Sequence, residues 1–244
     1  MSFRLKILTP TTGFNRAGYT TSLVRLVTYY AQNRIYPECA EQTLEYQTIE
    51  GSGISANRET LVQQFLESDA THVLFIDEDM GFDPRTLHVI AARRQPIVGC
   101  NYPMRVPGAG FTALAKDRNV RIITTEQGYG IEPVFYTGFG FCLIERSVFE
   151  KIERPWFLIG FNTTAKYYTT EDAAFAHKVH EAGIPWYVDH DASKGICHIG
   201  NYNYWWNEVK NGDSTGRLPS EVHGQRAEGQ NDHGNCESGA GCPQ

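Results

Sequence analysis

Residues 73–80 read Val73-Leu74-Phe75-Ile76-Asp77-Glu78-Asp79-Met80, four apolar side chains followed directly by three carboxylates. An uninterrupted apolar run of this kind is typical of a central strand that is buried on both faces of a parallel sheet. Ligands of open α/β sheets bind beyond the carboxyl ends of such strands. The segment therefore predicts an α/β fold with an acidic site at one edge of its sheet.

The spacing of the three acids indicates a cation site. Successive side chains of an extended strand point in opposite directions, so we expect Asp77 and Asp79 to project together and Glu78 to project away from them. Adjacent carboxylates repel each other, and hard divalent ions such as Mg²⁺ or Mn²⁺ prefer oxygen ligands. The alternative is that the acids only end a strand and begin a loop. Three consecutive carboxylates favour a role in binding metal or phosphate.

Length and charge limit the class of protein. The chain suffices for one large α/β domain, placed at 1–210, and a Gly- and Asn-rich tail at 211–244 that is flexible or ordered by partners. Lys and Arg number 22 against 28 Asp and Glu, which argues against a protein whose main task is to bind nucleic acid. The chain begins without a signal-peptide pattern and has no apolar run of membrane-spanning length, so we expect a cytoplasmic protein.

The six cysteines are expected to be thiols rather than a disulfide framework, because the chain reads as cytosolic. Cys236 and Cys242 lie in the tail near His233. Their spacing matches no strong zinc-binding pattern, so a zinc site there is a weak hypothesis.

Strand-like and helix-like segments alternate up to about residue 103, which predicts a mainly parallel, doubly wound sheet. In the helix that carries Asn57 and Arg58, Ser55 is the expected cap. Short strand-like pieces between residues 111 and 136 predict a smaller mixed or antiparallel section. A helix is expected from near Thr170 to Gly183, and residues 196–199 read as a late strand.

Three further features carry candidate chemistry. Gly138-Phe139-Gly140 precedes an apolar strand and could let the backbone approach a ligand, although taken alone it is better explained by a turn or bulge. Glu171 and Asp172 open a helix, where acids complement the helix dipole or supply a general base. His198 ends a strand, either as a hydrogen-bonded core residue or as an additional metal ligand.

Together these parts resemble glycosyltransferases with the GT-A fold, a Rossmann-like nucleotide-diphospho-sugar transferase fold, in particular family 2-like and mannan-polymerase-like members. The Asp-x-Asp motif of that family is matched by Phe75 to Asp79, and its Gly-rich aromatic loop resembles residues 138–150. Its Glu-Asp pair and later His are similar to Glu171-Asp172 and His198, and its Asn/Arg helix start to Asn57-Arg58. The resemblance spans about residues 4 to 206.

The resemblance implies a reaction and a site. A nucleotide-diphosphate sugar would bind with Mn²⁺ or Mg²⁺ and donate its sugar to a hydroxyl acceptor (a glycan, a protein or a modified nucleobase), with inversion. Asp79 would bind the metal, with Asp77 as a second metal or ribose contact and His198 as an additional ligand. Asp172 would be the base, with Glu171 as the fallback. The implied nucleotide contacts are Thr9, Pro10, Thr11, Asn57, Arg58, Asp77 and Glu78, and the implied acceptor contacts are Gly138, Phe139, Gly140 and Trp156.

The sequence also departs from that family. Its first strand ends in Thr9-Pro10-Thr11-Thr12 rather than the commoner Pro-x-Tyr-Asn, and only Glu50 stands where an Asp would read a uracil. A nucleotidyltransferase acting on a sugar phosphate is therefore kept as an alternative. A non-catalytic carbohydrate-binding protein, which would use the Tyr/Trp cluster at residues 202–206, is another. A homo-oligomer is left open.

Overall fold

The computed structural model describes residues 2–51, 53–105, 110–163, 166–200 and 203–208. The elements are β1 (Ser2–Thr11), α1 (Ala17–Gln32), β2 (Glu41–Glu50), α2 (Ile54–Leu66), β3 (His72–Ile76), β4 (Met80–Phe82), α3 (Thr86–Ala91), β5 (Ile97–Cys100), β6 (Leu114–Ala115), β7 (Ile131–Tyr136), β8 (Phe141–Glu145), α4 (Arg146–Lys151), β9 (Phe161–Asn162), β10 (Tyr167–Tyr168), α5 (Glu171–Glu181), β11 (Tyr187–Asp189), α6 (His190–Ser193), β12 (Ile196–Ile199), β13 (Asn203–Trp205) and the 3₁₀ turn η1 (Trp206–Glu208).

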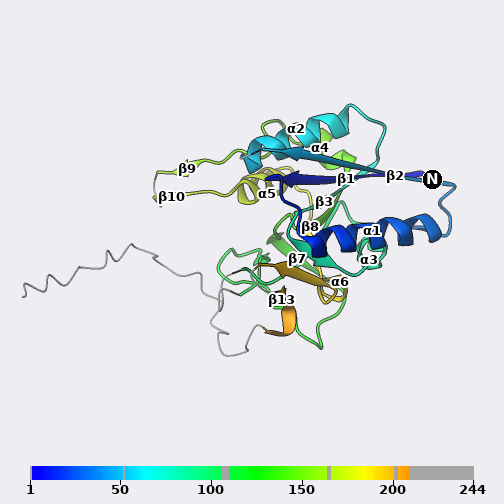
Figure 1. The fold of residues 1–244 in the computed structure, drawn as a ribbon. Helices are drawn as coiled ribbons and strands as arrows, with labels where there is room; N and C mark the ends of the chain where they lie inside the picture. Colours follow the sequence, from blue (N-terminus) through cyan, green and yellow to red (C-terminus); the bar gives the residue numbers. More distant parts are fainter. Residues whose placement is uncertain (1, 52, 106–109, 164–165, 201–202, 209–244) are drawn as a thin grey trace, which may run out of the picture.

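A mixed sheet of eight strands in the order β2-β1-β3-β8-β5-β11-β7-β6 forms the centre of the molecule (Figure 1). β2, β1 and β3 run parallel, as do β5 and β11. β8 lies antiparallel between β3 and β5, and β7 is antiparallel to both of its neighbours. The α/β class is thus confirmed, and the antiparallel strands enter the middle of the sheet as well as its end.

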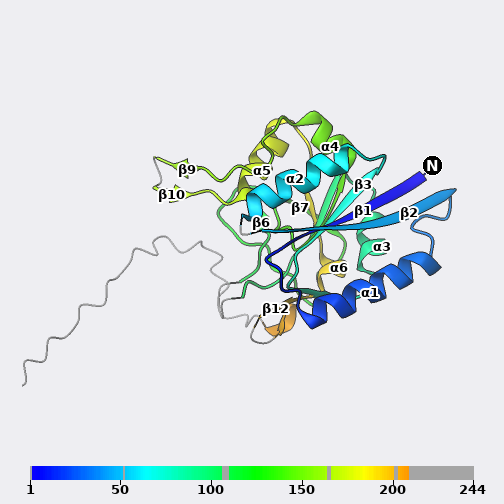
Figure 2. The same ribbon diagram turned by 45° about the horizontal axis from the view of Figure 1, so that its top comes forward.

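Helices cover both faces of this sheet. α2, α4 and α5 lie on one side, and α1, α3 and α6 lie on the other (Figures 1 and 2). Two apolar cores result: Val73 and Phe75 of β3 belong to the core under α2, and Leu74 and Ile76 belong to the core under α1. All four side chains are fully buried, so β3 is the two-faced central strand that its apolar run predicts.

A second, three-stranded sheet in the order β13-β12-β4 lies beside the carboxyl end of β3. β4 begins immediately after the acidic residues, and β12 pairs antiparallel with it so that His198 stands opposite Met80. This pairing brings a late segment of the chain to the acidic edge of the large sheet.

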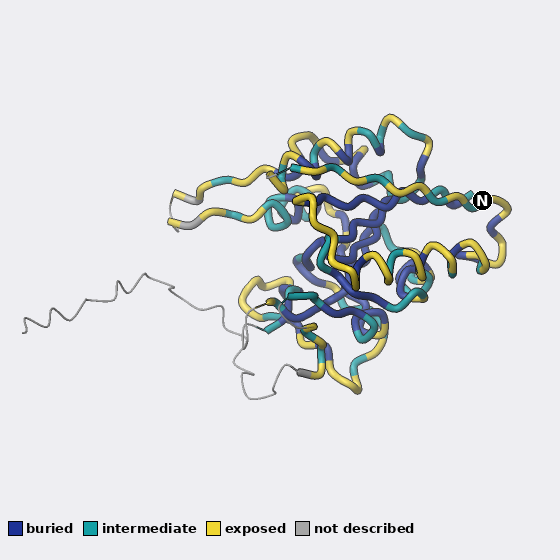
Figure 3. The backbone as a smooth tube through the Cα atoms, in the orientation of Figure 1, coloured by how far each residue is buried: buried dark blue, intermediate teal, exposed yellow. Residues whose placement is uncertain are grey.

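The β9–β10 hairpin projects from the body of the molecule (Figure 1), and each of its strands contains an exposed residue, Phe161 in β9 and Tyr168 in β10. Figure 3 shows the exposed residues over the whole chain. No helix among the described residues combines the length and apolar character that crossing a membrane requires.

The helix with Asn57 and Arg58 begins one residue before the expected cap. Gly53 is the N-cap of α2, and Ser55 lies inside the helix, where its hydroxyl donates to the carbonyl oxygen of Phe157. The prediction that Ser55 caps this helix is therefore wrong, because its side chain joins α2 to the segment before α5 instead.

Candidate functional site

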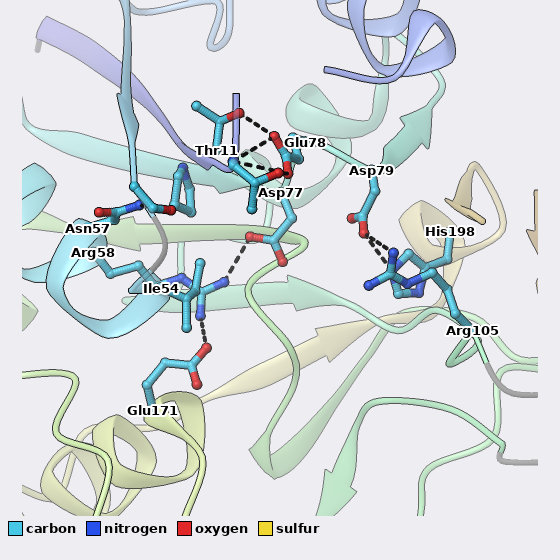
Figure 4. Close-up of a pocket in the computed structure, with 13 residues that line it drawn as sticks. Thr11, Ile54, Asn57, Arg58, Asp77, Glu78, Asp79, Arg105, Glu171 and His198 are labelled. Carbon is cyan, nitrogen blue, oxygen red and sulfur yellow. Dashed lines mark hydrogen bonds and ion pairs between the residues drawn. The ribbon is translucent and has the colours of Figure 1, made fainter. Parts of the chain in front are cut away.

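The three carboxylates lie in a turn rather than on a strand. β3 ends at Ile76, and the amide of Met80 donates to the carbonyl oxygen of Asp77 at 3.2 Å. The turn aims the side chains in three directions, toward α2, toward the end of β1 and toward β12 (Figure 4). The expectation that Asp77 and Asp79 project together from an extended chain is therefore wrong, because the strand ends before the acids begin.

Glu78 holds the segment that follows β1. Its carboxylate accepts hydrogen bonds from the backbone amide of Thr12 at 3.1 Å, from the Thr12 hydroxyl at 2.7 Å and from the Thr11 hydroxyl. The carboxyl ends of β1 and β3 are thereby joined, and the backbone of residues 10–12 is fixed beside the acidic turn.

Arg58 of α2 joins two carboxylates from different parts of the chain. One guanidinium nitrogen donates to Asp77 Oδ1 at 2.8 Å, and the other terminal nitrogen pairs with Glu171 Oε1 at the start of α5. The Arg58 side chain is 4% exposed, and its guanidinium lies 4.9 Å from the centroid of the Phe139 ring. Burial raises the pKa of Asp77 and of Glu171, while the Arg58 charge opposes that rise.

Asp79 pairs with two cationic or potentially cationic groups. Its Oδ2 lies 2.9 Å from a guanidinium nitrogen of Arg105 and 3.4 Å from Nε2 of His198. The Ile199 amide also donates to the Asp79 carbonyl oxygen at 2.7 Å, which fixes β12 to the acidic turn. Burial acts to raise the pKa of Asp79, but the His198 hydrogen bond and the charges of His198 and Arg105 outweigh it and lower the pKa.

The chemistry of Asp79 and His198 fits a divalent cation. Nδ1 of His198 lies 3.0 Å from the Pro103 carbonyl oxygen, which can only accept, so Nδ1 carries the proton. A metal ion bound at Nε2 would take the place of the proton that this nitrogen donates toward Asp79 Oδ2, and a ring fixed through its other nitrogen is common among metal-binding histidines. Among the described residues no three His, Cys, Asp or Glu side chains form a metal cluster, so water or a bound ligand would have to complete the coordination.

These groups line a cavity of about 280 Å³ at the carboxyl edge of the large sheet (Figure 4). Its lining consists of Pro10, Thr11, Thr12, Gly51, Ile54, Asn57, Arg58, Asp77, Glu78, Asp79, Arg105, Glu171 and His198. A second cavity, of about 650 Å³, shares Thr12, Glu78, Asp79 and Arg105 with the first and extends to the start of α1. Asp79 and Arg105 thus stand between the two spaces.

Most of the residues expected at the site are brought together, but six are not in its lining. Those that line the smaller cavity are Pro10, Thr11, Asn57, Arg58, Asp77, Glu78, Asp79, Glu171 and His198, and those that do not are Thr9, Gly138, Phe139, Gly140, Trp156 and Asp172. Thr9 is fully buried, and its hydroxyl lies 2.6 Å from the Tyr19 hydroxyl, so it supports the end of β1 from below.

The glycine-rich loop, residues 138–140, supports the site without lining the cavity. Phe139 is buried under Arg58 and packs against core aromatic rings. Neither glycine has room for a Cβ beside the Tyr102 hydroxyl, which accepts from the Gly140 amide at 2.9 Å. The Tyr102 ring in turn packs edge-on against His198, 5.3 Å between centroids. The loop therefore helps to position His198, and the expected direct contact of Phe139 with an acceptor finds no support.

Trp156 also belongs to the core. It is 6% exposed, and its indole nitrogen donates to the carbonyl oxygen of Ile152 at 3.1 Å. The large ring packs against Phe149 of α4, where its burial stabilises the fold, and it does not line the cavity.

The two acids at the start of α5 differ in direction. Thr170 is the N-cap residue, and Asp172 Oδ1 accepts from the Ala173 amide at 2.9 Å and from the Thr170 hydroxyl. Glu171 instead reaches the cavity and pairs with Arg58. The fallback base is thus the one whose carboxylate lines the cavity, whereas Asp172 satisfies groups at its own helix start.

Sequence reasoning missed Arg105. This residue follows the end of β5 by five positions, and β5 lies parallel to β3 two strands away. Because parallel strands end at the same edge of a sheet, a basic residue shortly after residue 100 could have been assigned to the acidic site. Cys236 and Cys242 lie outside the described residues, as does part of the Tyr/Trp cluster; Trp205 is half-exposed on β13.

No protein-family model matches this sequence, and no curated protein matches it significantly. Among solved structures, the chain is similar to that titled "Crystal Structure of A197 from STIV", with a TM-score of 0.52 and 21% identity over 81% of this chain and 86% of the other. This likeness shows a shared fold.

An inositol-1-phosphate CTP transferase from T. maritima is also similar, with a TM-score of 0.43 and 10% identity over 77% of this chain and 85% of that one. Its title names a CTP transferase acting on inositol 1-phosphate and does not name glycosyl transfer. At this TM-score the likeness carries no argument for either activity.

Proposed function

We propose that this protein is a GT-A-type glycosyltransferase that binds a nucleotide-diphosphate sugar together with Mn²⁺ or Mg²⁺ and transfers the sugar to a hydroxyl acceptor. The observation that carries the proposal is the pair of Asp79 Oδ2 and His198 Nε2, which lie 3.4 Å apart in the lining of a cavity. The Pro103 carbonyl accepts from Nδ1 of His198 and so directs Nε2 toward the carboxylate.

The residues around the cavity would divide the work. Asp79 and His198 would hold the ion, which when bound supplies positive charge for the leaving diphosphate. Pro10, Thr11 and Asn57, which line the cavity beside the end of β1 and the start of α2, would contact the nucleotide. Asp77 is already held by a buried arginine, so we assign it a supporting role rather than direct metal contact.

The acceptor hydroxyl needs a base, because it is a poor nucleophile until its proton is removed. Glu171 and Asp172 at the start of α5 are the candidates. The burial of Glu171 raises the pKa of its carboxyl, which brings it closer to the range in which a carboxylate is an effective base. Displacement by a single activated hydroxyl inverts the anomeric centre.

A nucleotidyltransferase acting on a sugar phosphate is the second candidate, because it too would use a divalent ion and several carboxylates at the edge of an α/β sheet. The charge of the cavity supports the first candidate instead. Four carboxylates line it against two arginines, so negative charge predominates in the lining. A nucleoside triphosphate, which carries more negative charge than a diphosphate sugar, would be harder to accommodate there.

The test compares the two reactions directly. The protein is incubated with Mn²⁺ and a panel of UDP-, GDP- and CDP-sugars while release of nucleoside diphosphate is measured. Parallel reactions contain a nucleoside triphosphate and a sugar 1-phosphate, and pyrophosphate is measured. Nucleoside diphosphate release that requires Mn²⁺ supports glycosyl transfer, and pyrophosphate release alone would establish the second candidate.

Asp79→Ala is expected to abolish the metal-dependent turnover while the circular dichroism spectrum stays unchanged. Asp69→Ala is the matched control, because this aspartate is 84% exposed and pairs with Arg4 far from the cavity. Full activity of the Asp79 variant would refute the assignment of the metal site.

A further inference from the structure

Arg105 lines the site, and none of the roles assigned above belongs to it. Its guanidinium lies 2.9 Å from Asp79 Oδ2, the same oxygen that His198 Nε2 approaches. The Arg105 side chain is 48% exposed, whereas that of Asp79 is 15% exposed. It also lines both cavities, so it stands at the boundary between the two spaces.

In Arg58, the other arginine that lines the smaller cavity, both terminal nitrogens are already engaged. Both terminal nitrogens of Arg58 bind carboxylates, and its side chain is buried over Phe139. The fork geometry that would suit a phosphate is therefore occupied. This leaves Arg105 as the arginine of the cavity lining that can turn toward a bound anion.

A divalent ion and the Arg105 guanidinium would compete for Asp79. An ion held between Asp79 and His198 would lie beside Oδ2, where the Arg105 guanidinium is paired, and two cations at that position repel each other. Because Arg105 is half-exposed, its ion pair with Asp79 is worth little, so a divalent ion can displace it at small cost. The displaced side chain would then be close to the phosphates that accompany the ion.

We propose that Arg105 is the counter-ion of Asp79 until a divalent ion replaces it, and that it then binds the diphosphate of the nucleotide. The inference rests on the proposed function, since it concerns the same metal and nucleotide. It adds a diphosphate-binding residue and an order of binding, in which the ion precedes the nucleotide.

The experiment measures two affinities of Arg105→Gln. Without nucleotide, Mn²⁺ affinity, followed by the electron paramagnetic resonance of free Mn²⁺, is expected to rise by up to about fivefold, because a competing exposed ion pair is lost. At saturating Mn²⁺, the affinity for UDP or GDP, measured by calorimetry, is expected to fall about tenfold or more, because a charged hydrogen bond to phosphate is lost.

Arg85→Gln is the matched control. Arg85 forms a 2.9 Å pair with Asp83 that is 68% exposed on the arginine side, away from both cavities. This variant should retain the wild-type affinities for Mn²⁺ and for the nucleotide.

Opposite changes in the two affinities of Arg105→Gln would support the inference. Unchanged or weakened Mn²⁺ binding would overturn the displacement step, and unchanged nucleotide affinity would overturn the diphosphate contact. If the wild-type protein binds neither Mn²⁺ nor a nucleoside diphosphate, the proposed function itself fails and the inference falls with it.

Discussion

Replacement of Arg58 by Met tests whether this arginine is held by Asp77 and Glu171 rather than free for phosphate. Methionine retains much of the apolar stem that packs over Phe139 and removes only the charge and its hydrogen bonds. The side chains that lose their partner are Asp77, 28% exposed, and Glu171, 15% exposed. Removing one partner of a fully buried pair costs about 3–5 kcal/mol, so a loss of about 3 kcal/mol in the free energy of unfolding is expected at neutral pH.

The loss should depend on pH, and the sign follows from the two carboxyls. Burial already raises the pKa of Asp77 and of Glu171, and without Arg58 both values rise further. The folded variant then binds more protons than the unfolded chain between the ordinary carboxyl pKa values and the raised ones. Its stability therefore falls as pH rises through that window, and the deficit relative to wild type is smaller at pH 5 than at pH 7.5.

Urea unfolding at the two pH values measures this deficit for Arg58→Met, with Arg85→Gln as a surface ion-pair control that should lose less than about 1 kcal/mol. A deficit below about 1 kcal/mol at both pH values would refute the reasoning. That result would mean that Arg58 does not stabilise Asp77 and Glu171 in the folded protein and is available to bind a phosphate.

Two further predictions concern the base and the core. If Asp172 is the base, Asp172→Asn should retain nucleotide binding but lose turnover by a factor of about 10² or more, and if Glu171 is the base, Glu171→Gln should do so. A residue whose variant keeps its turnover is not the base. His72 stacks on Phe3, and burial lowers its pKa from 6.5 to about 4. The free energy of unfolding should therefore rise with pH between these values. In urea unfolding, lowering the pH from 7 to 5 should cost the wild type about 2 kcal/mol more than it costs His72→Phe. An equal pH dependence of the two proteins would contradict the burial of a neutral His72.

Several parts of the fold could be predicted because local pattern and tertiary context agree. The apolar run of residues 73–76 is the two-faced strand β3, and α5 begins after Thr170 and ends before Gly183, whose φ of +68° suits a helix end. Residues 196–199 form β12 as expected. In each case the hydrophobic period and the punctuating residue point to the same element.

Other parts could not be predicted from local pattern. The three residues of β4 are too few to carry a periodic signal, yet their pairing with β12 brings His198 to Asp79. The insertion of β8 between β3 and β5 depends on which strands pair, which a single sequence does not encode locally. Side-chain partners such as Arg58 with Glu171, 113 positions apart, follow only from that topology.

Arg58 and Arg105, the arginines beside the acidic turn, differ in burial, and this difference assigns the three carboxylates distinct roles. Asp77 is held by an arginine that is 4% exposed and shared with Glu171, so freeing it would strand buried charges. Glu78 is occupied by the backbone amide and hydroxyl of Thr12. Asp79 alone among the three is paired with a half-exposed arginine and faces Nε2 of His198, so it is the carboxylate from which a divalent ion can displace a counter-ion at small cost.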